Sequence, residues 1–205
     1  MKYTGPKAKK VRRQGVNIYY ADKYDRVLQR KPYGPGKGPK SQTTRPSEFS
    51  SQLKEKQKAR DMFGLSEKQF RNLYAAASSM TGQTGDIFKT FLEKRLDNVI
   101  FRAGFAVTRL QSRQFAGHGL FLVDGVRVTS PSYRVRSGEK ITVRPQARSS
   151  PMFAPILAAH EKYMPPSWLK VDAGNLTIEV VGEPDPKDME QSIDMRQIVE
   201  FYSRT

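Results

Sequence analysis

Apolar positions along residues 47–94 repeat at the spacing of helices that each bury one face. One stripe, at i, i+3, i+4 and i+7, consists of Phe70, Leu73, Tyr74 and Ala77. Such a stripe is typical of a buried helix face, and Ser66 followed three residues later by Gln69 is the capping-box pattern that begins a helix. We therefore predict a helix from Ser66, another over residues 47–62 and a third from about Thr84.

Residues 95–144 combine two short helical stripes with runs that are typical of strands. The first stripe consists of Leu96, Val99, Ile100 and Ala103. Thr108 begins the second helix, with Gln111 as its capping partner, and Asp124-Gly125 is a strong signal for a type I′ hairpin turn. We predict a small sheet with strands within residues 120–123, 126–128, 132–136 and 141–144.

Charge is distributed unevenly along the 205 residues, whose formal net charge is +16. Residues 1–45 hold 13 Lys and Arg against 2 Asp and Glu, residues 96–150 hold 9 against 3, and residues 151–205 hold 5 against 9. So basic a chain usually meets a polyanion, either nucleic acid or an anionic membrane surface. Because no apolar run approaches the roughly 18 residues of a membrane span and no signal peptide is recognisable, we expect a soluble, cytoplasmic protein without a membrane partner.

The first 45 residues are rich in Gly and Pro and contain few large aliphatic residues. This composition disfavours long regular elements, so we predict an extended basic arm that is laid along a phosphate backbone and ordered largely by it. A floppy solubilising tail is the alternative. The tyrosines among the basic residues argue against a mere tail, because aromatic rings can stack on bases or pack on a scaffold.

These patterns together predict an α+β fold. It would consist of a mainly helical domain, an inserted small α/β RNA-binding module of two helices on a short antiparallel sheet, and the extended basic N-terminal arm. The expected boundaries are residues 1–45 for the arm, 46–94 with about 150–205 for the helical domain, and 95–149 for the module.

Basic side chains on the predicted helices are the candidates for RNA contact. Arg109 and Arg113 stand i, i+4 on one helix, and two guanidinium forks about one turn apart can reach successive phosphates. We expect Asp97 to hold a neighbouring arginine or Asn98, and His118 to cap the helix end, to pack structurally or to contact RNA. The full candidate set is Lys7, Lys9, Lys10, Arg12, Arg13, Arg30, Lys31, Lys37, Arg45, Lys54, Lys56, Lys58, Arg71, Arg95, Arg109, Gln111, Arg113, His118, Ser132, Tyr133 and Arg134.

Few residues of the chain are suited to catalysis or to binding a cofactor. The chain has no cysteine, which excludes disulfides, thiolate zinc sites and cysteine nucleophiles. Its two histidines, His118 and His160, lack paired ligand spacing, and the glycines of residues 34–38 lack the Gly-Lys-Ser/Thr of a phosphate-binding loop. We therefore expect no enzyme, no cofactor and no metal.

Two other classes of protein compete with a structural RNA binder. An RNA-modifying enzyme, such as a pseudouridine synthase, could carry the same small module, but residues 145–205 are too few and too acidic to supply a catalytic domain. A DNA-binding regulator could use the two helices as a helix-turn-helix, since Gln111 and Gln114 can offer amides to base edges.

The chain closely resembles the small-subunit ribosomal protein S four family of bacterial or organellar type. Its module carries Arg95-Leu96-Asp97-Asn98-Val99, Ala103-Gly104-Phe105-Ala106, Thr108-Arg109, Ala116-Gly117-His118-Gly119 and Pro131-Ser132-Tyr133. Similar landmarks flank it at residues 3–7, 12–15, 52–58, 67–71, 82–85, 168–172 and 198–203. The resemblance therefore covers essentially the whole chain.

This resemblance implies a two-domain protein that binds small-subunit ribosomal RNA at a multi-helix junction of the 5′ domain and nucleates assembly there. It also implies a place near the mRNA entry channel, beside small-subunit ribosomal proteins three and five, with an influence on decoding accuracy. Some members of the family repress translation of their own messenger.

The chain departs from the family pattern at two places. Many relatives have a Cys-x-x-Cys zinc motif where Ala8 and Val11 stand, so that zinc role is lost here. The loop that often reads Pro-Gly-Gln-His-Gly is Pro35-Gly36-Lys37-Gly38 in this chain. It exchanges an imidazole for a fixed positive charge, which keeps affinity for phosphate.

Overall fold

A computed structural model describes residues 3, 5–36, 38, 45–153 and 163–204. The chain divides into two compact units, residues 1–87 with 191–205 (unit 1) and residues 88–190 (unit 2). Within the described residues, no helix is both long and apolar enough to cross a membrane.

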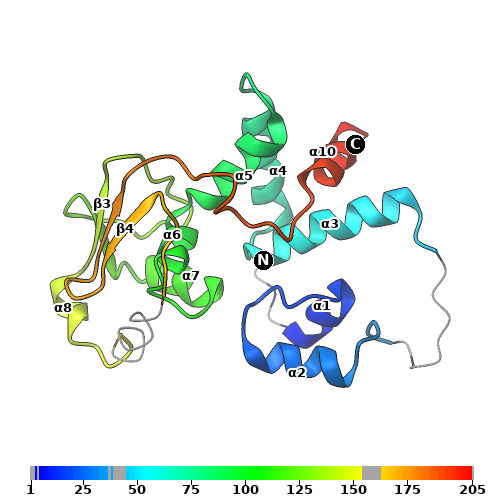
Figure 1. Ribbon diagram of the computed structural model, residues 1–205, viewed down its shortest axis with the longest axis horizontal. Helices are drawn as coiled ribbons and strands as arrows, with labels where there is room; N and C mark the ends of the chain where they lie inside the picture. Colours follow the sequence, from blue (N-terminus) through cyan, green and yellow to red (C-terminus); the bar gives the residue numbers. More distant parts are fainter. Residues whose placement is uncertain (1–2, 4, 37, 39–44, 154–162, 205) are drawn as a thin grey trace. The chain divides into compact units, whose positions relative to one another are not determined.

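Unit 1 is built from helices (Figure 1). They are α1 (Lys7–Gln14), α2 (Asp22–Arg30), α3 (Glu48–Met62), α4 (Glu67–Ser78), the start of α5 (Thr84–Glu93) and α10 (Met195–Ser203). The three helices predicted between residues 47 and 94 are confirmed, and Ser66 with Gln69 forms the expected capping box. Helix α10 packs against α3, and there the Gln52 side chain donates a hydrogen bond to Glu200 over 2.9 Å.

The amino-terminal arm is not extended throughout, and this part of the prediction was wrong. Helices α1 and α2 pack against each other, and α1 also contacts α3. Val11 is fully buried and Ile18 is 1% exposed, while the rings of Tyr19 and Tyr24 lie 5.5 Å apart. Gly15, in the left-handed region at φ 76°, ends α1 and permits the turn between the helices. A few well-placed apolar side chains therefore fold a segment whose average composition suggested an unstructured arm.

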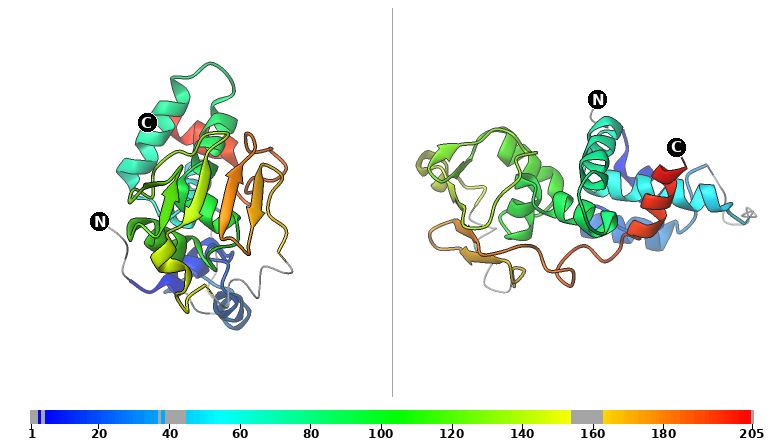
Figure 2. Two further views of the ribbon diagram at one scale, coloured as in Figure 1. Left: turned by 90° about the vertical axis from the view of Figure 1, so that its left-hand side faces the viewer. Right: turned by 90° about the horizontal axis from the view of Figure 1, so that it is seen from above.

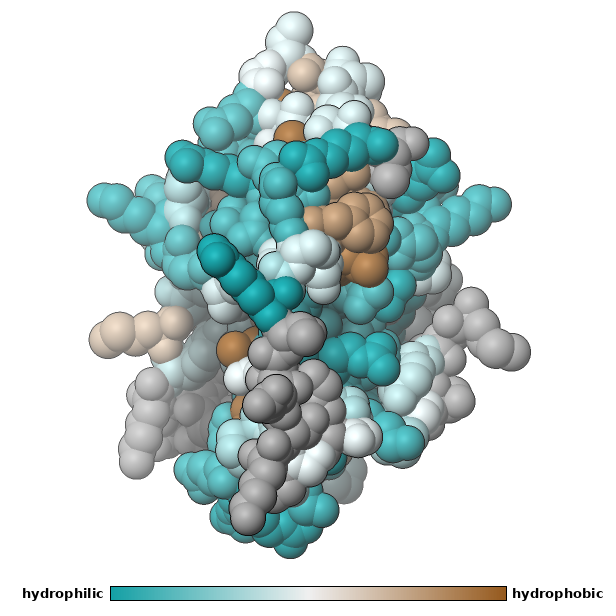
Figure 3. All heavy atoms as spheres, turned by 90° about the vertical axis from the view of Figure 1, so that its right-hand side faces the viewer, coloured by the Kyte–Doolittle hydropathy of each residue, from teal (hydrophilic) through white to brown (hydrophobic). Residues whose placement is uncertain are grey.

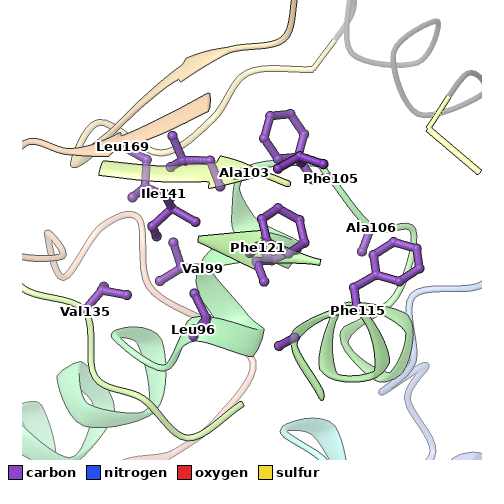
Figure 4. Packing of buried hydrophobic residues seen from close by; sticks show 14 of the residues in the cluster. Leu96, Val99, Ala103, Phe105, Ala106, Phe115, Phe121, Val135, Ile141 and Leu169 are labelled. Atoms are coloured by element: carbon purple, nitrogen blue, oxygen red, sulfur yellow. The ribbon is translucent and has the colours of Figure 1, made fainter. Parts of the chain in front are cut away.

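Unit 2 places two helices against an antiparallel sheet. It contains α6 (Leu96–Arg102), α7 (Arg109–Gly117), β1 (Phe121–Val123), β2 (Val126–Arg127), β3 (Lys140–Val143), α8 (Pro145–Arg148), β4 (Leu169–Asp172) and β5 (Thr177–Val180). The strand order is β2-β1-β3-β5-β4. Between helices and sheet lies an apolar core that includes Val99, Phe105, Phe121 and Ile141 (Figure 4).

The sheet draws two strands from the carboxyl-terminal part of the chain, which corrects the predicted boundary at residue 149. In Figure 2 the orange strands β4 and β5 lie beside β3, and Lys140 is paired with Glu179. Residues 132–136 were predicted to form a strand but make only an isolated bridge, between Arg134 and Arg95. The edge of β3 is occupied by β5, and the segment is held instead by backbone hydrogen bonds to Lys94 and Leu96.

Local signals in the module are otherwise confirmed. Asp124 and Gly125 both have positive φ, 48° and 81°, as a type I′ turn requires. The Thr108 hydroxyl accepts a hydrogen bond from the Gln111 backbone and caps α7. The Gln111 side chain in turn accepts one from the Val107 backbone, one residue before the expected position.

Gly119 is a position where a side chain would be costly. Its φ is +65°, and an added Cβ would lie 2.4 Å from Arg127 Nε and 3.0 Å from Thr129 Cγ2. We expect Gly119→Ala to lower the free energy of unfolding by about 1–2 kcal/mol. Urea denaturation measures this, and Gly117→Ala is the matched control because nothing lies within 4 Å of its added Cβ. Equal stability of the two variants would contradict the prediction.

Candidate nucleic-acid interface

A buried ion-pair cluster lies where α6 begins. Arg95 is 2% exposed and donates two hydrogen bonds to Asp97, from Nε over 3.0 Å and from Nη2 over 2.7 Å. Arg113 reaches the same carboxylate from α7, with Nη1 at 3.3 Å from Oδ2. Burial lowers the pKa of the Arg113 guanidinium, and the charge of Asp97 opposes that shift. Asp97 therefore joins the two helices, as expected of a residue that holds neighbouring arginines.

Arg109 belongs to a second buried network. Its Nε donates to Asn98 Oδ1 over 2.8 Å, and its Nη2 donates to Glu190 Oε2 over 3.1 Å. Asn98 also donates to Glu93, which accepts two hydrogen bonds from Arg102. This network links Glu190, the last residue of unit 2, to helices α6 and α7 by hydrogen bonds.

Both networks correct the interpretation of Arg95 and Arg109 as phosphate-binding residues. Their guanidinium groups are buried and hydrogen-bonded to carboxylates or an amide. They therefore neutralise the carboxylates of Asp97 and Glu190 inside unit 2. Arg113 is half-buried and shares Asp97. The i, i+4 spacing of Arg109 and Arg113 places them on one side of α7, where both are paired with carboxylates of unit 2.

A different segment of unit 2 carries exposed basic groups. Along residues 132–136, exposure alternates with burial: Ser132, Arg134 and Arg136 are exposed, Tyr133 is half-buried and Val135 is fully buried. Backbone hydrogen bonds hold this segment, from Leu96 to the carbonyl of Tyr133 and from Val135 to that of Lys94. The outward side chains therefore form a row on a fixed backbone.

Arg134 is stacked on an aromatic ring. Its guanidinium carbon lies 3.8 Å from the centre of the Phe91 ring, a geometry in which cation–π attraction and stacking both favour a fixed orientation. Partial burial and the nearby charge of Arg95 lower the pKa of Arg134.

His118 and Arg127 form another exposed pair in unit 2. His118 ends α7 as its C-cap residue, and its carbonyl accepts a hydrogen bond from Arg127 Nη2 over 3.1 Å. The capping role expected for His118 is thus present in its backbone, while its side chain stays exposed. The imidazole remains a candidate for RNA contact.

In unit 1, four exposed cations form two i, i+4 pairs on the arm helices. Lys9 and Arg13 lie on α1, and Arg26 and Arg30 lie on α2. All four side chains are exposed, and none forms an ion pair within the described part of the chain. We call these four residues the arm cluster. Hydrophilic residues cover most of the face of unit 1 seen in Figure 3.

Other basic residues of the arm are engaged in internal contacts. Lys10 is paired with Asp61 at 2.6 Å and lies over the Tyr3 ring. Arg12 donates hydrogen bonds to the carbonyls of Tyr33 and Gly34 and fixes the loop after α2. Lys7 lies 5.8 Å from the Tyr19 ring centre but is exposed. Burial raises the pKa of the Tyr19 hydroxyl, so this ring stays neutral in the folded arm.

The three candidate lysines of α3 differ in environment. Lys54 is exposed, Lys58 is paired with Glu55 at 2.6 Å, and Lys56 is buried against Glu67 at 2.7 Å. Burial would raise the pKa of the Glu67 carboxyl, but the hydrogen bonds and charges of Lys56 and then Arg60 lower it. Lys56 therefore has a structural role, and of the three only Lys54 is freely presented to solvent.

Comparisons with known proteins agree with this architecture. Residues 2–93 match the ribosomal protein S4/S9 N-terminal domain, and residues 94–141 match the S4 domain. The chain is 42% identical over 206 residues to small ribosomal subunit protein uS4 of Roseiflexus sp. (strain RS-1), with 99% of each chain covered. It is 40% identical over 209 residues to the protein of that name from Thermus thermophilus, and 39% to that from Desulfitobacterium hafniense (strain Y51), each again with 99% of both chains covered. The chain belongs to the uS4 family.

Membership of the uS4 family confirms the resemblance seen in the sequence, because the relatives match along the whole chain. The family is one of ribosomal structural proteins and not of enzymes. Among the described residues, no group of three or more His, Cys, Asp or Glu side chains could hold a metal ion.

The remaining candidate residues of this uS4 chain fall into two sets. Arg30, Lys31, Arg45 and Arg71 are exposed, as an RNA contact requires. Gln111 is engaged at the start of α7, and the Tyr133 hydroxyl donates to Glu139 over 2.6 Å, which raises the pKa of Tyr133. Lys37 lies outside the described residues.

Three residues that we did not select join the candidate interface. Arg26 was missed because α2 was not predicted, and only a helix would bring it beside Arg30. Arg136 continues the alternation that includes Ser132 and Arg134, a signal already present in the sequence. The contact of Phe91 with Arg134 has no signal in the sequence, because 43 positions separate them.

Proposed function

We propose that this chain is a structural constituent of the small ribosomal subunit that binds 16S-type ribosomal RNA. The observation that carries the proposal is how its cations are used. Buried arginines of unit 2 neutralise internal carboxylates, whereas the arm cluster of unit 1 and the row at residues 132–136 expose cations without ion-pair partners among the described residues. Exposed, unneutralised charge on two folded supports suits recognition of an RNA backbone.

The mechanism would be recognition of shape. Folded RNA presents phosphates and 2′-hydroxyls, and lysines and arginines at fixed positions bind one arrangement of RNA helices better than others. Each neutralised phosphate releases counterions, which supplies much of the binding free energy. Because α1 and α2 are packed helices, the arm cluster holds its charges in place before RNA arrives, and less entropy is lost on binding than with an unstructured arm.

The site on the RNA would be a multi-helix junction of the 5′ domain, where binding nucleates assembly. We further propose small-subunit ribosomal proteins three and five as neighbours, with mRNA near its entry channel and an influence on decoding accuracy in a cytoplasmic ribosome. These finer assignments are supported by family membership and by the chain carrying charged surfaces on two separate units, which allows contact with more than one partner.

Footprinting the purified chain on small-subunit ribosomal RNA tests the proposal. We expect protection to cluster at one junction of the 5′ domain, and the logarithm of the binding constant to fall linearly with the logarithm of salt concentration. The slope should be roughly 0.7 to 0.9 for each phosphate neutralised. Protection spread evenly over the RNA, or an affinity independent of salt, would contradict the proposal.

A further inference from the structure

The row formed by Ser132, Arg134 and Arg136 lies on a segment whose backbone is hydrogen-bonded to Lys94 and Leu96. Side chains of an extended segment alternate between its two faces, and Val135, which is fully buried, anchors the inner face of this one. The Arg95–Arg134 bridge fixes the backbone at the centre of the row. The outward groups are consequently held on a rigid support and not on a mobile loop.

Carboxylates near this row are already engaged. Asp97 accepts hydrogen bonds from Arg95 and Arg113, and Glu139 accepts them from the Tyr133 hydroxyl and the Arg136 backbone. Neither guanidinium of the row forms an ion pair with a carboxylate within the described ranges. The row therefore keeps two uncompensated positive charges next to the hydroxyl of Ser132.

At Arg134 this row offers more than charge. Its guanidinium carbon lies over the Phe91 ring, 3.8 Å from the ring centre, while the side chain remains exposed. Guanidinium planes and aromatic rings are the surfaces on which proteins stack unpaired RNA bases. A lysine or arginine that only binds phosphate needs no ring beneath it.

We infer that Arg134 and Phe91 form a platform on which one unpaired nucleobase of the bound RNA stacks. The guanidinium is sandwiched between the Phe91 ring and the base, and Arg136 and Ser132 bind the phosphate or 2′-hydroxyl of adjoining nucleotides. This inference rests on the proposed RNA-binding function and adds to it. The chain recognises a single-stranded feature of the junction as well as its backbone shape.

The test compares two exchanges that keep the net charge. Arg134→Lys retains the positive charge but removes the planar group, and Phe91→Leu retains an apolar side chain but removes the ring. Affinity is measured for the full chain with a 5′-domain fragment of small-subunit ribosomal RNA and with a fully paired RNA duplex of equal length. Arg148→Lys is the matched control, because Arg148 is an exposed arginine of unit 2 that lies outside the row.

We expect each platform variant to bind the junction fragment about fivefold or more weakly, as for the loss of a base stack. Duplex affinity and the salt dependence should stay unchanged, and Arg148→Lys should change junction affinity less than about twofold. The double variant should be little weaker than either single one, because both remove the same stack.

The outcomes separate this inference from the proposed function. If the wild-type chain fails to bind the junction fragment, the proposed function itself is overturned. If the wild type binds and Arg134→Lys binds equally well, or loses duplex and junction affinity alike, the platform is overturned and RNA binding stands. Arg134 is exposed, so its variant should unfold at the wild-type temperature and decide the matter even if Phe91→Leu misfolds.

Discussion

Replacing Arg95 with methionine should lower the free energy of unfolding by about 3–5 kcal/mol. Arg95 supplies both short hydrogen bonds to the buried Asp97 carboxylate, and the third, from Arg113, is longer at 3.3 Å. Without Arg95, the buried Asp97 carboxylate has only the half-buried Arg113 left as an ion-pair partner among the described residues. Urea denaturation followed by circular dichroism measures the loss.

A paired substitution is the control for this prediction. Arg95→Met combined with Asp97→Leu removes both buried charges together, and most of the lost stability should return, because the cost arises from an unpaired charge rather than from a missing contact. Arg113 is partly exposed and can be solvated after the change. A double variant no more stable than Arg95→Met alone would show that the cluster stabilises unit 2 in another way.

Neutralising the arm cluster, by changing Lys9, Arg13, Arg26 and Arg30 to glutamine, should reduce the salt dependence of RNA binding sharply. If each side chain neutralises one phosphate, the slope of log affinity against log salt concentration falls by about 3 in magnitude. The affinity at low salt falls as well. Filter binding over a range of salt concentrations with the 5′-domain RNA fragment gives both quantities.

Lys140 and Lys170 provide a comparison for the arm cluster on the other unit. Both are exposed lysines of unit 2, and Glu179 lies 3.6 Å from one and 4.0 Å from the other. Their change to glutamine should alter the slope by less than about 1. The variant in which all four arm-cluster residues are changed to glutamine should keep the wild-type unfolding midpoint, because none of these four side chains is buried or ion-paired among the described residues. A fourfold variant with the wild-type slope would remove the arm cluster from the interface.

Helices with a regular apolar period could be predicted from the sequence, and those at the arm could not. The apolar stripes of α4, α5 and α6 each repeat over two turns, whereas α1 buries only one apolar residue, Val11, beside Gln14, and α2 buries only Tyr24. A short helix of this kind depends on its tertiary contacts. The Gly and Pro content averaged over the first 45 residues does not reveal such a helix.

The candidate site was predictable in composition but not in detail. Arg109 and Arg134 look alike in the sequence, since each lies in the basic module near hydroxyl-bearing residues. Their different roles depend on distant partners, because Glu190 is 81 positions after Arg109. Burial of a charged residue is decided by such long-range pairs, which no local pattern reveals.

The position of β5 between β3 and β4 determines when this chain can acquire its structure during synthesis. The sheet of unit 2 is completed only after residue 180 has emerged, and α10, which packs on α3, follows at Met195–Ser203. Neither unit can therefore complete its fold until residues 169–203 have been synthesised, although most of the residues of both units are made earlier. A product terminated before Leu169 would leave one edge of β3 open and α3 uncovered. Such a product is suited to degradation rather than to competing with the complete protein for RNA.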